Sequence, residues 1–302
     1  MSQTVFNHES DLTAELAPRS SASQDLIEAP LIVIEPARRF SSAWIREVWT
    51  YRELLFFLAW RDVKVRYKQT ALGMIWVVMQ PLLMTLIFTV VLGMLARVPT
   101  RGQPYALVVY IGLLPWTFFS SAVTQSVASI VGNSNLITKV YFPRVIIPAA
   151  SVLARLVDLG VALVVLVGLL LYYRVVPTWQ ILLLPPLVVL IAVLALGFGM
   201  LGAAVNVRYR DLGVVLPVII QLWMFLSPVL YPASLVRDTW PRAYTAYALN
   251  PIAGIVNGFR AAILGQPVEW FSLVWSIVFT PLIVGASLYI FRRVERSFAD
   301  VI

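Results

Sequence analysis

The stretch that decides the fold is residues 60–81, WRDVKVRYKQTALGMIWVVMQP. Its first nine positions carry four cations against one acid: Arg61, Lys64, Arg66 and Lys68 against Asp62. No charged residue follows from Ala71 to Ala96, a run of 26 mostly apolar positions. Because cations favour the headgroup layer and about 20 apolar residues cross roughly 30 Å of hydrocarbon, this stretch predicts the entry of the chain into a membrane.

The composition of the whole chain agrees with a membrane protein. Of its 302 residues, 60% are hydrophobic and 13% are charged, and the mean hydropathy is +0.84; soluble domains are about 25% charged. The chain has no cysteine, which excludes disulfides, thiolate metal sites and cysteine nucleophiles. Its one histidine, His8, lies in a polar tail, so histidine-based chemistry in the membrane body is also excluded.

The net charge of +8 is unevenly distributed along the chain. Residues 1–35 hold six acids and one base, while the remaining positions carry a net charge of +13. The bases cluster at the ends of apolar runs, which favours anionic lipid headgroups over nucleic acid as their partner. Residues 1–40 show no sustained periodicity and are predicted to be a disordered cytoplasmic tail, either plain or regulatory.

Residues 41–59 are predicted to form an amphipathic helix. One apolar stripe recurs at helical spacing: Trp44, Val48, Tyr51, Leu55 and Leu58. The run is too short and too charged to cross a membrane, so we expect it to lie in the interface, with a soluble helix packed on a partner as the alternative. Residues 41–70 would then form an interface helix and basic entry, and residues 71–302 the transmembrane domain.

Hydropathy predicts an all-α polytopic fold with six transmembrane helices. The expected spans are about 72–96, 105–130, 146–173, 180–206, 213–230 and 270–291. Residues 231–268 contain two short apolar runs broken by Asn250-Pro251, which predicts a re-entrant helix pair or, alternatively, an ordinary extracytoplasmic loop. If both termini share one side, that side collects 15 Lys and Arg, so the positive-inside rule places both termini in the cytoplasm. The opposite loops collect 6, namely Arg97, Arg101, Arg174, Arg237, Arg242 and Arg260.

One charged pair, Arg155 and Asp158, lies inside the third span. The two residues are i, i+3 neighbours, so they either neutralise each other within the bundle or contact a substrate or moving parts. The sequence has no P-loop motif (G-x-x-x-x-G-K followed by S or T) and no cluster of carboxylates in the spans. We therefore expect no catalytic residue and no metal site, and a conduit whose energy comes from elsewhere.

Several motifs together resemble one family of transport proteins. Residues 58–81 show an L-x-x-R-D-x-x-x-R-Y pattern, then Thr70, an L-G-x-x-W element and a proline. Further matches are Asn135-Leu136, Tyr141-Phe142-Pro143-Arg144, Arg208-Tyr209-Arg210-Asp211 and Asn250-Pro251. Over about residues 41–295 the chain is similar to ABC-2 type ABC transporter permeases, in particular those that export O-antigen, teichoic acid or capsular polysaccharide.

The resemblance implies a half-transporter. Two copies would form a homodimer, and two separate ATP-binding cassette subunits would bind ATP and Mg, so this chain would have no cofactor and would not be an enzyme. In this family, the short cytoplasmic helix between the second and third spans couples the permease to the ATPase. The positions that match it are Asn135, Leu136, Lys139, Tyr141, Phe142 and Arg144.

The same resemblance implies a route between the two copies, lined mainly by the first and fifth spans. Sugars stack their apolar faces on aromatic rings and form hydrogen bonds with polar groups, and a sliding polymer needs many weak contacts. The lining candidates are Trp76, Gln80, Gln221, Trp223, Phe225 and Tyr231. An ordinary bundle or interface role is the alternative for each of them.

The function that we expect is therefore that of the permease subunit of an ATP-driven exporter in the bacterial cytoplasmic (inner) membrane. Its substrate would be a lipid-linked polysaccharide such as O-antigen, moved from the cytoplasmic to the outer side. The alternatives are an ABC-2 exporter of a small lipid or drug, a membrane enzyme that modifies lipid-linked sugars, and a non-transporting membrane scaffold.

Overall fold

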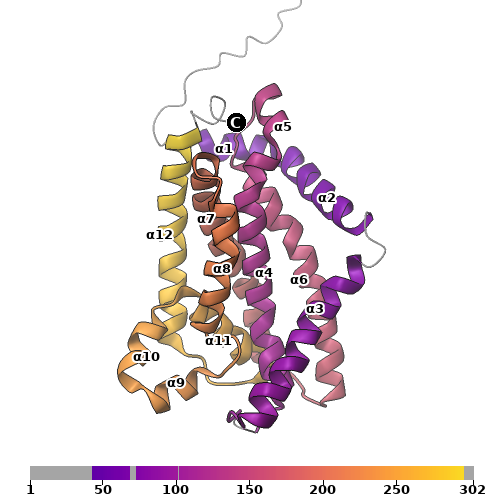
Figure 1. Cartoon of the computed structure of the whole chain (residues 1–302), viewed down its shortest axis with the longest axis vertical. Helices are drawn as coiled ribbons and strands as arrows, with labels where there is room; N and C mark the ends of the chain where they lie inside the picture. The colour runs from indigo at the N-terminus through magenta and orange to yellow at the C-terminus, as the bar shows by residue number, and fades with distance from the viewer. Residues whose placement is uncertain (1–42, 69–72, 101, 296–302) are drawn as a thin grey trace, which may run out of the picture. The chain divides into compact units, whose positions relative to one another are not determined.

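The computed structural model describes residues 43–68, 73–100 and 102–295 (Figure 1). The chain divides into two units, residues 1–44 and 45–302, and the second holds all of the described residues except Ala43 and Trp44. The predicted tail 1–40 lies outside the described residues. Within the described part every regular element is a helix, as the sequence predicts.

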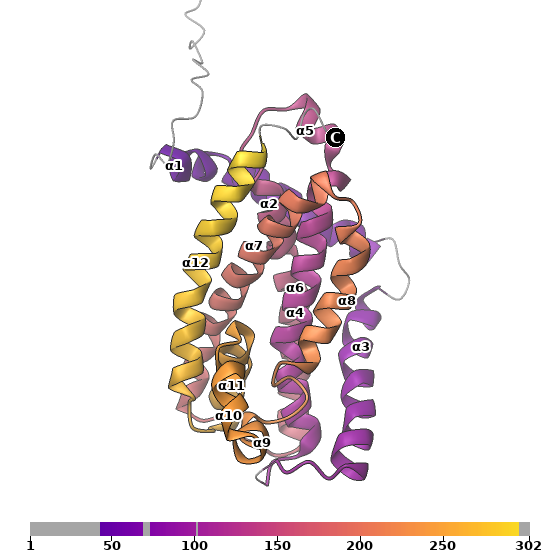
Figure 2. The ribbon, with the colours of Figure 1, turned by 60° about the vertical axis from the view of Figure 1, so that its left-hand side comes forward.

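The helices follow one another along the chain with short connections. Their bounds are α1 Ala43–Thr50, α2 Arg52–Lys68, α3 Gly73–Phe88, the π-helical turn η1 Thr89–Leu95, α4 Tyr105–Gly132, α5 Ser134–Lys139, α6 Ile146–Tyr172, the 3₁₀ turn η2 Trp179–Leu183, α7 Leu184–Arg208, α8 Leu212–Phe225, α9 Ala233–Thr239, α10 Pro241–Ala248, α11 Pro251–Leu264 and α12 Trp270–Glu295. Helices α2 and α5 lie at one end of this unit, and α9 and α10 lie at the other (Figures 1 and 2).

Among the residues that the structure describes, five helices are long and apolar enough to cross a membrane: Ile75–Leu95, Tyr105–Gly132, Ile146–Tyr172, Trp179–Arg208 and Trp270–Glu295. They coincide with five of the six expected spans. The expected fifth span is represented by α8, whose 14 residues extend about 21 Å. That is shorter than the hydrocarbon layer, so the count of six spans stays a prediction.

The helix predicted over residues 41–59 is divided in the structure. Its first part is α1, which ends at Thr50, and its second part belongs to α2, which starts at Arg52 and continues through the basic segment to Lys68. Its location in the membrane interface stays a prediction. The extension has a local cause, because residues 52–68 contain no Gly or Pro and include several good helix formers. The cations of the entry segment are therefore presented by a rigid helix.

Helix α4 is the centre of the bundle. It packs against α3, α6, α7 and α11, and 78% of its most apolar window is buried, against 11–28% in the other four long helices. Small residues allow the closest approach, since a Cβ on Gly199 of α7 would lie 2.6 Å from the Ser126 Cβ of α4. The amide of Asn206 also donates to the Val127 carbonyl across this contact, at 3.1 Å.

The segment predicted as a re-entrant pair contains three short helices. Helices α9 and α10 are separated at Trp240, because Pro241 starts a new helix but cannot continue one. Asn250 caps α11 by accepting from the Ile252 N–H at 3.1 Å, and it also contacts Ser227 and Trp223 at the end of α8. The turn between α10 and α11 is thereby fixed to α8.

Arg260 differs from its expected position in an extracytoplasmic loop. It lies inside α11 and is only 2% exposed. Its guanidinium donates to the carbonyls of Val108, Tyr231 and Val229 at 3.2, 3.0 and 2.7 Å. The buried cation therefore connects α11 to α4 and to the chain that follows α8.

Candidate functional site: a basic cleft between α2, α3, α4 and α6

A cleft of about 990 Å³ lies between α2, α3, α4 and α6. Along α4 it extends from Asn133 to Thr117, which is about 24 Å at 1.5 Å per residue. Helix α3 packs mainly on α4 and has few contacts with α2 and α6. The cleft occupies the space that is left between α3 and these two helices. It begins at the end of the bundle that carries α5 and runs along the spans.

The mouth of the cleft is a polar contact between α2 and the end of α4. The Arg61 guanidinium lies 2.8 Å from the Asp62 carboxylate and donates to the Asn133 side-chain oxygen at 2.9 Å. The Asn133 amide in turn donates to the Ser129 carbonyl at 2.8 Å. The entry helix and the last turn of α4 are joined by these bonds.

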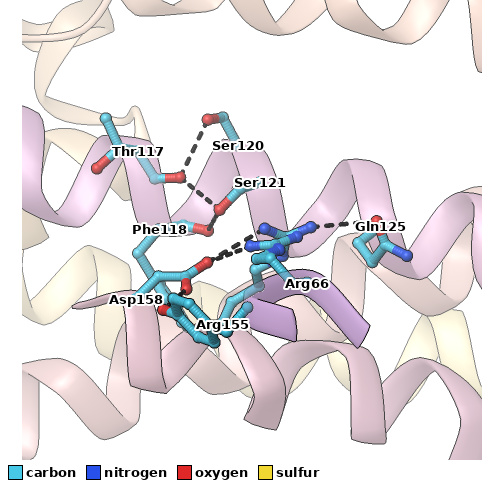
Figure 3. Close-up of polar contacts among 9 residues, drawn as sticks. Arg66, Thr117, Phe118, Ser120, Ser121, Gln125, Arg155 and Asp158 are labelled. Atoms are coloured by element: carbon cyan, nitrogen blue, oxygen red, sulfur yellow. Dashed lines mark hydrogen bonds and ion pairs between the residues drawn. The ribbon is translucent and has the colours of Figure 1, made fainter. Parts of the chain in front are cut away.

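The middle of the cleft is organised by Asp158 of α6. Arg66 and Arg155 both pair with its Oδ2 atom, the second at 3.1 Å, and Tyr67 donates to Oδ1 at 2.6 Å. Figure 3 shows Arg155 extending to the Gln125 oxygen of α4, at 3.1 Å. The pair that the sequence places in the third span thus has further partners on α2 and α4.

The electrostatics at this point favour a donor role for Tyr67. Burial, followed by the hydrogen bond to Asp158, raises the pKa of the Tyr67 hydroxyl above its ordinary value, so it keeps its proton at neutral pH. Among the side chains that line the cleft, three guanidiniums (Arg61, Arg66 and Arg155) face two carboxylates (Asp62 and Asp158). The lining therefore has a net positive charge.

The inner part of the cleft combines apolar side chains with hydroxyls. Val77, Pro81, Phe118, Leu159 and Ala162 supply the apolar surface. Thr117 of α4 donates to the Leu114 carbonyl of its own helix at 3.2 Å. Ser120 and Ser121 both donate to the Thr117 carbonyl, at 3.2 and 2.7 Å (Figure 3). Because these hydrogens are used within the helix, the hydroxyl oxygens can act as acceptors toward the cleft.

The predicted lining residues fall into two groups within one chain. Trp76 and Gln80 of α3 line the cleft, and Trp76 is 59% exposed. The other four lie on α8 or just after it: Gln221 and Phe225 are exposed, and the Tyr231 hydroxyl donates to the Phe225 carbonyl. Trp223 instead packs edge-to-face on Phe119 and Phe198 and donates to Asn250.

The segment expected to couple to an ATPase lies at the α5 end of the bundle. Asn135, Lys139 and Tyr141 are exposed, and Leu136 is half-buried. Phe142 is buried, and Arg144 contacts Glu295 at the end of α12. The segment therefore has an inner side fixed to the bundle and an outer side with a cation and an aromatic ring.

Of the predicted membrane-entry cations, Arg61 and Arg66 face the cleft, while Lys64 and Lys68 are exposed on α2. Sequence reasoning did not identify Tyr67, Gln125 or Asn133 as site residues. The row of hydroxyls in the second span, at 117, 120, 121 and 124, was a usable signal because its spacing places them on one helical face.

The comparisons with known proteins cover most of the chain. The model of the ABC-2 type transporter family matches residues 53–264. The O-antigen export system permease protein RfbA of Myxococcus xanthus is 32% identical over 72% of this chain and 82% of its own length. A protein of the same name from Klebsiella pneumoniae is 28% identical over 83% and 95%.

Another relative is named for the transport of a different polymer. The polysialic acid transport protein KpsM of Escherichia coli is 27% identical over 76% of this chain and 89% of its own length. The matched region contains the cleft, the α5 segment and the buried Arg260. The chain belongs to the ABC-2 type transporter family.

Proposed function

We propose that the chain is the permease subunit of an ATP-driven exporter of lipid-linked polysaccharide. The observation that carries the proposal is its similarity, over most of its length, to proteins named as O-antigen export permeases and a polysialic acid transport protein. In this proposal two copies pair, each works with a separate ATP-binding cassette subunit, and ATP and Mg are bound by those subunits. The polymer crosses from the cytoplasmic to the outer side of the inner membrane.

The arrangement of the described residues supports this proposal. The helix ends and loops at the α5 end carry four cations, as expected of a cytoplasmic face with both termini on it: Lys139, Arg144, Arg208 and Arg210. The exposed Lys139 and Tyr141 provide a surface for a partner subunit beside the bundle. With α8 as a sixth crossing, α3 and α8 would border the route between the two copies.

Copurification tests the proposal and separates it from its rivals. The chain is expressed with its genomic neighbours, extracted in mild detergent and isolated through a tag. We expect a second polypeptide with a P-loop at one copy per permease, in an assembly of two of each. A non-transporting scaffold predicts no ATPase, whereas an exporter of a small lipid or drug predicts an ATPase but unchanged surface polysaccharide when the gene is removed.

A further inference from the structure

We propose that the cleft between α2, α3, α4 and α6 binds the phosphate group of a lipid headgroup, with Arg155 and Arg66 as its donors. A lipid-linked glycan carries such a phosphate between its tail and its sugars, so the inference deepens the proposed function and rests on it. The proposal stands on three features of the cleft: its charge, its polarity gradient and its access from the side.

The charge in the middle of the cleft favours an anion. One carboxylate, Asp158, is shared by two guanidiniums, and the Arg155 side chain is only 12% exposed. A cation in such a place is costly unless an anion balances it. Guanidinium is suited to phosphate, since it is always charged and its planar fork can donate two parallel hydrogen bonds to phosphate oxygens.

The polarity of the lining falls along the cleft, from charged groups at the mouth and in the middle to neutral hydroxyls and apolar side chains further in, which is the order that a lipid headgroup requires. Arg61 and Asn133 lie at the mouth, Arg155 and Gln125 in the middle, and Phe118 and Leu159 further in. A phosphate at Arg155 would place hydroxyl-bearing groups toward the mouth and a hydrocarbon chain toward the apolar part. A volume of about 990 Å³ is at the upper end of ordinary ligand sites.

Access from the side is provided by the loose packing of α3. This helix touches α6 and α2 only lightly, although it forms one wall of the cleft. Trp76 and Val65, on facing helices at the rim, are 59% and 48% exposed. The headgroup and the first part of a hydrocarbon tail could therefore enter while the rest of the tail remains among the lipids, and a free anion would not need such a side opening.

A purely structural role for the cluster is the competing explanation, in which Arg66, Tyr67 and Asp158 only fasten α2 to α6. The two explanations predict opposite effects when the carboxylate of Asp158 is removed. A tether is weakened by removal of either partner of the ion pair. An anion site is weakened by removal of Arg155, but it is preserved or strengthened by removal of the competing carboxylate of Asp158.

The test is a binding titration on the full-length chain in dodecyl maltoside, a detergent without phosphate. The probes are geranyl phosphate, geraniol, inorganic phosphate and phosphatidylglycerol. We expect saturable binding of geranyl phosphate, with inorganic phosphate at least about tenfold weaker and no saturable binding of geraniol. Arg155→Gln should weaken geranyl phosphate binding about tenfold or more, as expected for lost charge-assisted hydrogen bonds, and Asp158→Asn should not weaken it.

Arg208→Gln is the matched control, because Arg208 is an exposed arginine at the same end of the bundle but outside the cleft. If Arg155→Gln does not fold, Arg66→Gln gives the same comparison from a more exposed position. Equal affinities for Arg155→Gln and Arg208→Gln, or equal losses for Arg155→Gln and Asp158→Asn, would overturn the proposal.

The probes also separate the sources of the phosphate. Equal affinity for inorganic and geranyl phosphate would overturn the assignment to a lipid. Equal affinity for phosphatidylglycerol and geranyl phosphate would overturn the link to the exported substrate in favour of an ordinary membrane lipid. Since no ATPase or transport is measured, failure here is distinct from failure of the proposed function.

Discussion

Replacement of Arg260 by Met should destabilise the bundle, because the guanidinium joins three segments. Methionine keeps most of the stem volume but leaves the carbonyls of Val108, Val229 and Tyr231 without their donor. Each unsatisfied buried carbonyl costs about 1–3 kcal/mol. The substitution also removes the cost of burying a cation, which returns several kcal/mol of stability. The three lost contacts together cost about 3–9 kcal/mol before that return, so we expect a net loss of a few kcal/mol, or on the order of 10 °C in apparent melting temperature for a chain of this size.

The assay is thermal unfolding of the purified chain, followed by the fraction that stays monodisperse on size-exclusion chromatography. Arg237→Met is the matched control, because Arg237 is about half exposed and pairs with Glu269 at 2.6 Å. A pair of this kind contributes about 1 kcal/mol or less. If Arg260→Met melts at or above the wild-type temperature, the carbonyl contacts do not outweigh the burial of the cation, and the reasoning is refuted.

Three other outcomes are expected. Gly199→Ala should lower the apparent melting temperature by several degrees, because the added Cβ has no room against α4. Gly168→Ala is the control, because its Cβ would meet nothing within 4 Å and the melting temperature should stay unchanged. Equal melting temperatures of the two variants would contradict tight packing of α4 on α7. Asn250→Ala removes a helix cap and two side-chain contacts, so a loss of about 2 kcal/mol in the same assay is predicted, and no loss would show that the turn is held otherwise. Lys139→Ala and Tyr141→Ala should leave the melting temperature unchanged but abolish the response of the proposed ATPase to the permease, and normal stimulation would rule out this docking surface.

The long helices could be predicted from the sequence because the signal is local. An uncharged run of more than 20 residues can be recognised without knowledge of its neighbours, and the positions of α4, α6 and α12 follow closely from hydropathy. The end of α8 could not be predicted with the same precision. Its last turn gives way to a loop near Pro228, where contacts with Asn250 and Arg260 decide the backbone.

The cleft could not be predicted because it depends on contacts between distant parts of the chain. Arg155 and Asp158 are neighbours in sequence, and their pairing follows from helical spacing. Arg66 and Tyr67 approach Asp158 from more than 90 positions away, through the packing of α2 on α6. Likewise, Arg260 was counted with the loops opposite the termini because it lies outside the six expected spans, and only its three carbonyl partners explain its burial.

The central claim is that this chain carries lipid-linked polysaccharide across the membrane, and the location of that glycan tests it most directly. The chain is depleted in its own cells, and glycans are labelled with a membrane-impermeant reagent before and after permeabilisation. The account predicts that surface label disappears, that lipid-linked glycan accumulates inside, and that the wild-type chain restores both. Unchanged surface glycan after depletion, with no internal accumulation, would contradict the account.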